Sequence, residues 1–187
     1  MKTENKILLD KIIKNKCAKL GFESMEIQKE GPVVSILKED WHLFIEFRNP
    51  LLPPLQLQCA ITIEEDDIRL LCFPSPVIIT DETMNEFIRF CNEANRELCG
   101  GMAWGRFWCD EENYDFAYEV ILPEKVIEKD IEETARQLFD IPCAHYQDLH
   151  TPLIMLAGNR WESDMAICYL QELRENGYVD NADYDLW

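Results

Sequence analysis

The chain has 187 residues, of which 47% are hydrophobic and 11% aromatic, a composition that supplies the core of one folded domain and argues against disorder. Its 36 acidic side chains against 18 basic ones give a formal charge of −18, which excludes nucleic acid and anionic membrane surfaces as favoured partners. A basic protein partner would be attracted by this charge, but acidity is also a common route to solubility, and that reading is favoured.

Neither a membrane anchor nor an exported protein is indicated. No apolar run reaches the roughly 18 residues that a membrane-spanning helix needs, and the lysine-interrupted start does not read as a signal peptide. The eight cysteines are spread singly among mostly apolar neighbours and form no closely spaced pair. Buried free thiols fit this spacing, so we expect a cytoplasmic, reducing location.

The first part of the chain predicts one helix followed by strands. Apolar residues recur at helical spacing over 3–20, with Gly21 placed to end the helix. Alternating or β-branched residues then predict four strands, over 33–37, 41–48, 55–63 and 68–72. The three prolines of segment 49–54 cannot donate ladder hydrogen bonds, so this segment is predicted to be a connection.

The second part predicts a helix, a hairpin and further helices. The helix covers 81–99, and the hairpin arms are 102–109 and 114–122. Three helices follow, over 126–138, 145–157 and 163–176. Strands and helices segregate instead of alternating, so the sequence predicts a single α+β domain over 1–176, with an antiparallel sheet and a helical part at 125–176. The acidic tail 177–187, including Trp187, is predicted to fray.

Four local features resemble the YbjN family of bacterial proteins, described as sensory transduction regulators. They are the acidic hairpin ITIEEDDIRLLC leading into PVIITDE, the helix segment FIRFCNEANREL, the strand start at Gly105 to Phe107 that turns through DEEN, and the segment TPLIMLAGN. They occur in the family's order over about residues 55 to 170. The resemblance implies the fold of type III secretion chaperones and a chaperone-like or regulatory protein-binding module, with a homodimer by analogy. It implies no cofactor and no catalytic residue.

The residues Trp104, Arg106 and Trp108 are the main candidate for a partner-binding site. A strand places all three on one face, and Trp and Arg dominate the energetics of protein interfaces. Two alternatives stay open, because Phe107 and Cys109 on the opposite face are also apolar. Either the tryptophan face is exposed and binds a partner, or helices cover it and the tryptophans belong to the core. Because one side must be buried, the second reading is favoured.

Two further groups carry weaker hypotheses. Asn92 and Asn95 share a helix face, where they contact either a partner or the neighbouring backbone, and the second reading is favoured. Cys143, His145 and His150 are the closest set to a metal site, which would make the chain a small metal-dependent protein or enzyme. Without paired ligand spacing, a buried cysteine beside two surface histidines is favoured. A third alternative is an acidic immunity or stress protein that neutralises a basic partner.

Overall fold

The computed structural model describes residues 3–19, 33–39, 42–49, 51–64, 66–99 and 104–175, and these form an α+β fold, as predicted. The elements, in chain order, are α1 (Thr3–Lys19), β1 (Val33–Glu39), β2 (His42–Asn49), β3 (Leu52–Ile63), β4 (Asp67–Ser75), α2 (Met84–Leu98), β5 (Gly105–Asp110), β6 (Asp115–Pro123), α3 (Glu124–Lys129), α4 (Ile131–Ala135), the π-helical turn η1 (Arg136–Asp140), α5 (Ile141–Ala157) and α6 (Ser163–Glu175).

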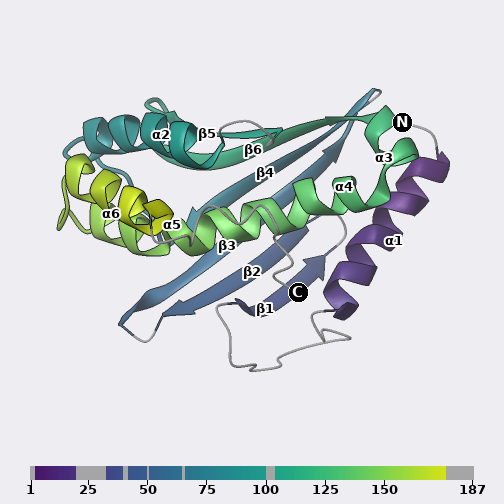
Figure 1. Ribbon diagram of the computed structural model, residues 1–187, viewed down its shortest axis with the longest axis horizontal. Coiled ribbons are helices and arrows are strands. Elements are labelled where there is room, and N and C mark those ends of the chain that lie inside the picture. The colour runs from purple at the N-terminus through teal and green to yellow at the C-terminus, as the bar shows by residue number, and fades with distance from the viewer. Residues whose placement is uncertain are drawn as a thin grey trace.

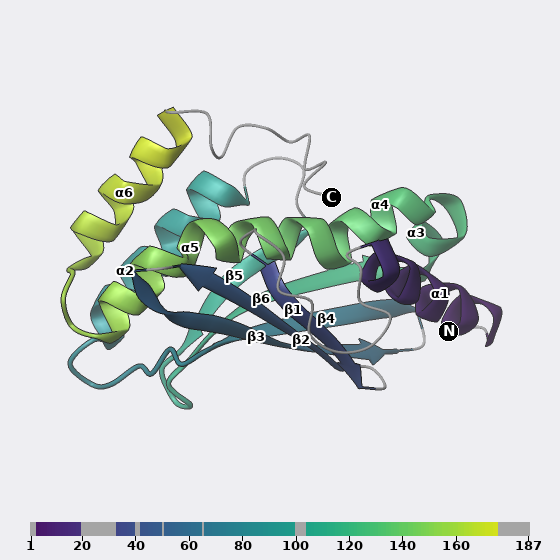
Figure 2. The ribbon, with the colours of Figure 1, turned by 90° about the horizontal axis from the view of Figure 1, so that it is seen from below.

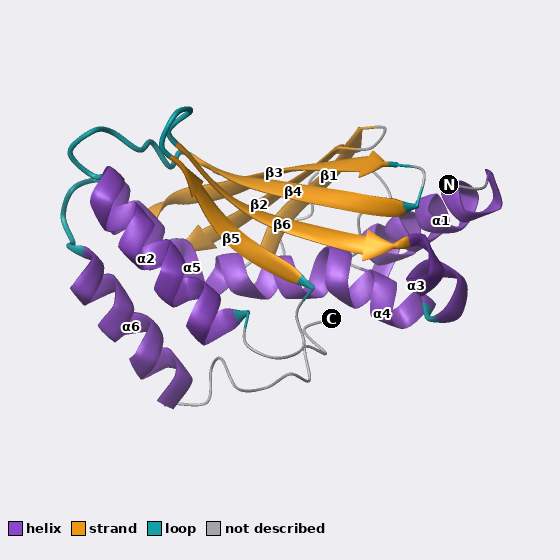
Figure 3. Ribbon diagram, turned by 90° about the horizontal axis from the view of Figure 1, so that it is seen from above, coloured by secondary structure: helices purple, strands orange, loops and turns teal. Residues whose placement is uncertain are grey.

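The strands form one six-stranded sheet in the order β1-β2-β3-β4-β6-β5, with every neighbouring pair antiparallel. The first four strands follow one another as a meander, and the hairpin β5–β6 joins it through β6. Long helix α5 runs across the sheet (Figure 1). Views from the other two sides show the described helices gathered on one side of the sheet, with α2 and α6 side by side at one end and α1 and α3 at the other (Figures 2 and 3).

The core lies between the sheet and α5, because the strands alternate in the way that the sequence predicts. In β3 the residues Leu55, Leu57, Cys59 and Ile61 are buried, and their alternates are more exposed. Register places Cys59 opposite Cys72 of β4, which is also buried. The α5 residue Tyr146 closes the layer, since its hydroxyl donates a 2.7 Å hydrogen bond to the backbone carbonyl of Cys72.

Helix α6 is tied to α2 at its first turn. The backbone N–H of Ser163 donates to a carboxylate oxygen of Glu86 at 2.6 Å, and Arg89 forms an ion pair with Asp164 at 2.6 Å. An anionic side chain at a helix N-terminus satisfies one of the unpaired amides and complements the helix dipole. Hydrogen bonding from Ser163, through its side chain and its backbone N–H, lowers the pKa of Glu86.

The prediction that 49–54 is a connection is wrong. Strand β3 begins at Leu52 and includes Pro53 and Pro54, and Leu52 pairs with Asn49 of β2. Strand β4 pairs with β3 only from Gln56 onward. The prolines therefore lie at the start of a strand with a neighbour on one side only, where a missing donor is tolerated.

The C-terminal helices are divided differently from the prediction. The helix expected over 126–138 breaks at Asp130, which has an extended backbone (φ −147°, ψ 96°) and whose carboxylate accepts the Glu133 N–H at 2.9 Å. The chain then stays helical through η1 into α5, which begins at Ile141 instead of 145 and carries Pro152 inside it. The third helix is present as α6, and the tail 177–187 lies outside the described residues. None of the described helices combines the length and apolar character that crossing a bilayer requires.

Candidate functional site

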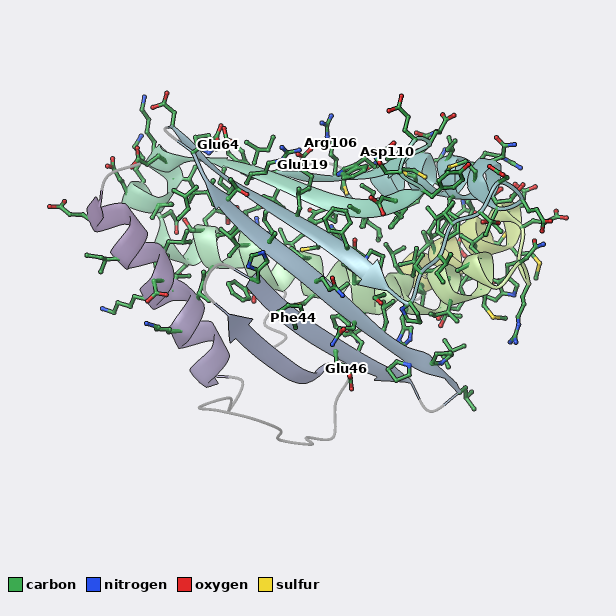
Figure 4. The ribbon with its side chains drawn as sticks, turned by 180° about the vertical axis from the view of Figure 1, so that it is seen from behind. Phe44, Glu46, Glu64, Arg106, Asp110 and Glu119 are labelled. Atoms are coloured by element: carbon green, nitrogen blue, oxygen red, sulfur yellow. The ribbon has the colours of Figure 1, made fainter. Side chains whose placement is uncertain are left out.

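The second hairpin presents Trp104, Arg106 and Trp108 on the side of the sheet opposite the helices. Phe107, between them, is 2% exposed and faces the core, whereas Trp104 is 50% exposed and the Arg106 side chain 72% exposed. Trp108 is half-buried. Figure 4 looks onto this side of the sheet, and no described helix crosses it. The favoured reading, that helices cover the tryptophan face, is wrong, because the structure has this face exposed. We call this side of the sheet the open face.

An aromatic row crosses the open face from β4 to β5. The rings of Phe73 and Trp108 meet edge to face, with centroids 6.0 Å apart and an interplanar angle of 89°. Between their strands lies β6, where Ala117 is the register partner of Trp108 and is fully buried. Because alanine is small, the two rings can close over it. The row therefore places ordered aromatic surface on a side of the sheet that no described helix covers.

Next to this row lies a charged group centred on Glu119. Its side chain is only 5% exposed although it lies on the open face, and Arg69 and Arg106 both contact its carboxylate. Arg106 donates to Oε2 at 3.2 Å, and Arg69 from β4 contacts Oε1. A carboxylate shielded from water needs such compensation, because an unpaired buried charge is strongly destabilising. Figure 4 shows Arg106 and Glu119 side by side near the β5 border of the face.

The end of the hairpin carries a pair of like charges. Asp110 and Asp115 are register partners on β5 and β6, and directly opposite like charges are unfavourable in a sheet. Asp110 accepts hydrogen bonds from the Asn113 side chain at 2.7 Å and the Glu112 backbone N–H at 2.8 Å, and these bonds lower its pKa. Within the described segments, no lysine or arginine forms an ion pair with either aspartate.

Asn95 closes the edge of the sheet and does not present its amide to a partner. Its Nδ2 donates to the backbone carbonyl of Phe107 at 2.8 Å, and its Oδ1 accepts the Phe107 N–H at 2.7 Å. The Trp104 N–H is bound by Gln137 Oε1 at 3.0 Å. Strand β5 is an edge strand, and side chains thus occupy backbone groups that would otherwise invite another strand. For Asn95 the structure therefore has the favoured reading, a contact with the neighbouring backbone instead of a partner. Asn92 on the same helix is exposed.

Replacing the two asparagines separately tests this assignment. We expect Asn95→Ala to lower the free energy of unfolding by about 1–3 kcal/mol, because two partly buried backbone groups of Phe107 lose their partner. Asn92→Ala, one turn earlier and exposed, is the matched control and should change it by less than about 0.5 kcal/mol. Urea unfolding followed by circular dichroism measures both, and equal losses would contradict the edge-closing role.

The alternative metal site does not assemble. Cys143, His145 and His150 are all buried on α5, so the prediction of two surface histidines is wrong. His150 contacts the carbonyl of Pro53, near the start of β3, at 2.8 Å. The rings of Phe107 and Tyr118 flank His145 at 5.6 and 5.2 Å. The described segments hold no group of three histidine, cysteine or acidic side chains placed to bind a metal ion.

His145 and Asp148 are two groups of α5 whose pKa burial shifts strongly. His145 is 1% exposed, and neither ring nitrogen has a hydrogen-bond partner within the described part of the chain. Burial lowers the pKa of His145 to about 3 and raises that of Asp148 to about 7. Both groups are therefore favoured in their neutral forms inside the fold, as desolvation predicts.

The thiols of Cys72, Cys91, Cys99 and Cys109 are poor nucleophiles. Burial is the main cause that raises the pKa of Cys91 and Cys99 to about 12 and that of Cys109 to about 11. Burial and the neighbouring Cys59 raise the pKa of Cys72 as well. Because the thiolate is the reactive form, these side chains act as small apolar groups of the core.

Neither protein-family models, nor curated proteins, nor solved structures give a match to this chain. The resemblance to the YbjN family stays a prediction. Sequence reasoning found the three β5 residues of the open face but missed Arg69, Phe73 and Glu119. The signal was present, since Arg69, Leu71 and Phe73 alternate with the buried residues of β4 and include two large apolar side chains on the supposedly wet side.

Proposed function

We propose that this chain is a non-catalytic protein-binding module, chaperone-like or regulatory in the sense of the YbjN family, which acts in the cytoplasm and binds its partner on the open face. The observation that carries the proposal is the exposure of Trp104, Arg106 and the half-buried Trp108 on a side of the sheet that no described helix covers. Tryptophan and arginine are the residues most often found at binding hot spots.

The size of the face supports the same proposal. Strand β4 has 9 residues, which corresponds to about 30 Å of extended chain. Five neighbouring strands, β2 to β5 in sheet order, span about 20 Å at the usual strand spacing. The projected area is on the order of 600 Å², close to the roughly 800 Å² that each partner buries in a standard interface.

Removing exposed apolar groups of the open face tests the proposal. The double variant Trp104→Ala/Ile121→Ser changes two side chains that are exposed in the free protein, so it should fold normally. Its matched control is Met165→Ala, an equally exposed apolar residue on α6. Tagged wild type, face variant and control are used to capture proteins from the native lysate, with quantification by mass spectrometry.

We expect one protein to be recovered equally by wild type and control, and at least about tenfold less by the face variant, since hot-spot truncation costs 1.4 kcal/mol or more. Circular dichroism and thermal unfolding confirm that the variant is folded. Equal recovery of this partner by the face variant would exclude the open face as its binding surface.

A further inference from the structure

We infer that the partner presents a basic amphipathic helix to the open face, with its apolar stripe on the Phe73–Trp108 row and a lysine or arginine at the Asp110–Asp115 pair. The inference rests on the proposed function and adds the chemical class of the partner. Three observations carry it: the apolar row, the position of the Asp110–Asp115 pair, which forms no ion pair with a described lysine or arginine, and the negative net charge of the protein.

The apolar part of the face is continuous across the strands. Leu71 on β4 is the register partner of Glu119, one step along the strand from Phe73, and Ile121 is 44% exposed on β6. On β2 the side chain of Phe44 also lies on this face (Figure 4). Side chains of this kind, half-buried by their neighbours, offer an apolar strip along which the stripe of a helix can lie.

The negative charge of Glu119 is paired with arginines, whereas the two aspartates at the end of the hairpin form no ion pair with a described lysine or arginine. Glu119 is compensated by Arg69 and Arg106. Asp110 and Asp115 lie opposite each other, and no described lysine or arginine forms an ion pair with them. A cation of the partner placed between these carboxylates would remove their repulsion and would lie near the indole of Trp108, the ring type that attracts cations best.

The same charges argue against a second copy of this chain as the occupant. Each copy carries a formal charge of −18, so two copies meeting face to face repel each other over the whole approach. A basic partner is instead attracted from a distance and associates faster at low ionic strength. Charge complementarity therefore selects a basic partner over self-association.

The form of the occupant follows from the sheet. Asn95 and Gln137 bind the backbone of Phe107 and Trp104 at the β5 edge, which disfavours an added strand at this edge. On the inner side, α5 already packs along the same sheet through a row of apolar residues. A helix of about 20 residues covers the roughly 30 Å length of β4 and can place one cationic side chain at the hairpin end.

Synthetic peptides test the inference on the full chain. Three fluorescein-labelled 20-residue peptides are compared by fluorescence anisotropy: one with a leucine stripe and a lysine polar face, one with the same stripe and a glutamate polar face, and a scrambled form of the lysine peptide without a stripe. Asp115→Lys removes the like-charge pair, and Glu132→Lys makes the same change of charge at an exposed position of α4.

We expect the lysine helix to bind at least about tenfold more tightly than either the glutamate helix or the scrambled peptide, because only it matches both the stripe and the charge. Asp115→Lys should weaken it about fivefold or more, and Glu132→Lys less than about twofold. Equal binding of the scrambled peptide, preference for the glutamate helix, or equal effects of the two lysine variants would overturn the inference. So would concentration-dependent dimerisation, measured by sedimentation velocity, that Trp104→Ala abolishes.

Failure of this inference is distinguishable from failure of the proposed function. If capture of a partner is sensitive to Trp104→Ala/Ile121→Ser but the lysine helix fails, the open face binds proteins of another chemistry. If the face variant captures the partner as well as the wild type does, the binding surface lies elsewhere. Both the proposed binding site and the inferred helical partner are then wrong.

Discussion

Gly105→Ala should unfold at a much lower denaturant concentration than the wild type, with a loss of about 3 kcal/mol or more in the free energy of unfolding. A Cβ at this position would overlap the Cζ and Oη atoms of Tyr118, whose ring is fully buried between Phe107 and His145. The ring cannot retreat into solvent, so the backbone of β5 must shift. Overpacking of this kind typically costs about 1–3 kcal/mol and more where nothing can relax.

Gly158→Ala is the matched control. Its Cβ would lie 3.2 Å from the carbonyl oxygen of Ile154 at the exposed end of α5, where a small adjustment suffices. We expect a change of less than about 1 kcal/mol for this control. Urea unfolding by tryptophan fluorescence and circular dichroism measures both variants. A Gly105→Ala variant as stable as Gly158→Ala would mean that β5 and Tyr118 are not packed as described.

Replacing His145 or Asp148 should change the pH dependence of the free energy of unfolding. The pKa of His145 falls from its usual 6.5 to about 3, so the unfolded chain takes up a proton between these values that the folded chain refuses. His145 therefore stabilises the fold above pH 6.5, and this contribution is lost as the pH falls. The slope is about 1.4 kcal/mol for each pH unit.

Asp148 has the opposite sign. Its pKa rises from 3.8 to about 7, so the folded chain holds a proton that the unfolded chain releases. This contribution is fully present below pH 3.8 and is lost as the pH rises to 7. In the wild type the two slopes oppose each other over the range that they share, roughly pH 4 to 6.5.

Single variants separate the two slopes. Relative to the wild type, His145→Leu should gain stability as the pH falls from about 6.5 to 5, reaching about 2 kcal/mol at pH 5. Asp148→Asn should instead gain relative stability as the pH rises from about 5 to 7. Urea titrations at about pH 5, 6 and 7 stay above the isoelectric point of about 4.5, where solubility is lowest. Differences from the wild type that do not vary with pH would show that these groups titrate normally in the fold.

Much of the sheet could be predicted from the sequence because burial on one side imposes alternation. The period of two in Leu55, Leu57, Cys59 and Ile61 predicted β3, and the same pattern in Phe116 to Leu122 predicted β6. For β5 the pattern could not decide, because Trp104 and Trp108 on one face compete with Phe107 on the other. Its orientation depends on Tyr118 and α2, which are distant in sequence and pack against Phe107.

The candidate residues of the open face were predicted where a local pattern defines them and missed where tertiary contacts do. Arg106 and Trp108 lie on β5 and Trp104 directly precedes it, so local spacing was sufficient. Glu119 is distinguished by its ion pairs with Arg69 of β4 and Arg106 of β5, and the sequence could not show this pairing. His145 was placed at the surface because α5 was expected to begin four residues later than it does. The continuous helix through η1 rotates this side chain into the core.

The closed edge of β5 also has a consequence for selectivity. When an extended segment pairs with an open sheet edge, most of its hydrogen bonds involve its backbone, so an open edge can bind many different sequences. With the backbone of Phe107 already bound to Asn95, the proposed complex would depend at this end of the sheet on the side chains of the face. Each mismatch in size or charge then lowers affinity directly, and the range of acceptable ligands narrows from any extended segment to those with the right surface chemistry.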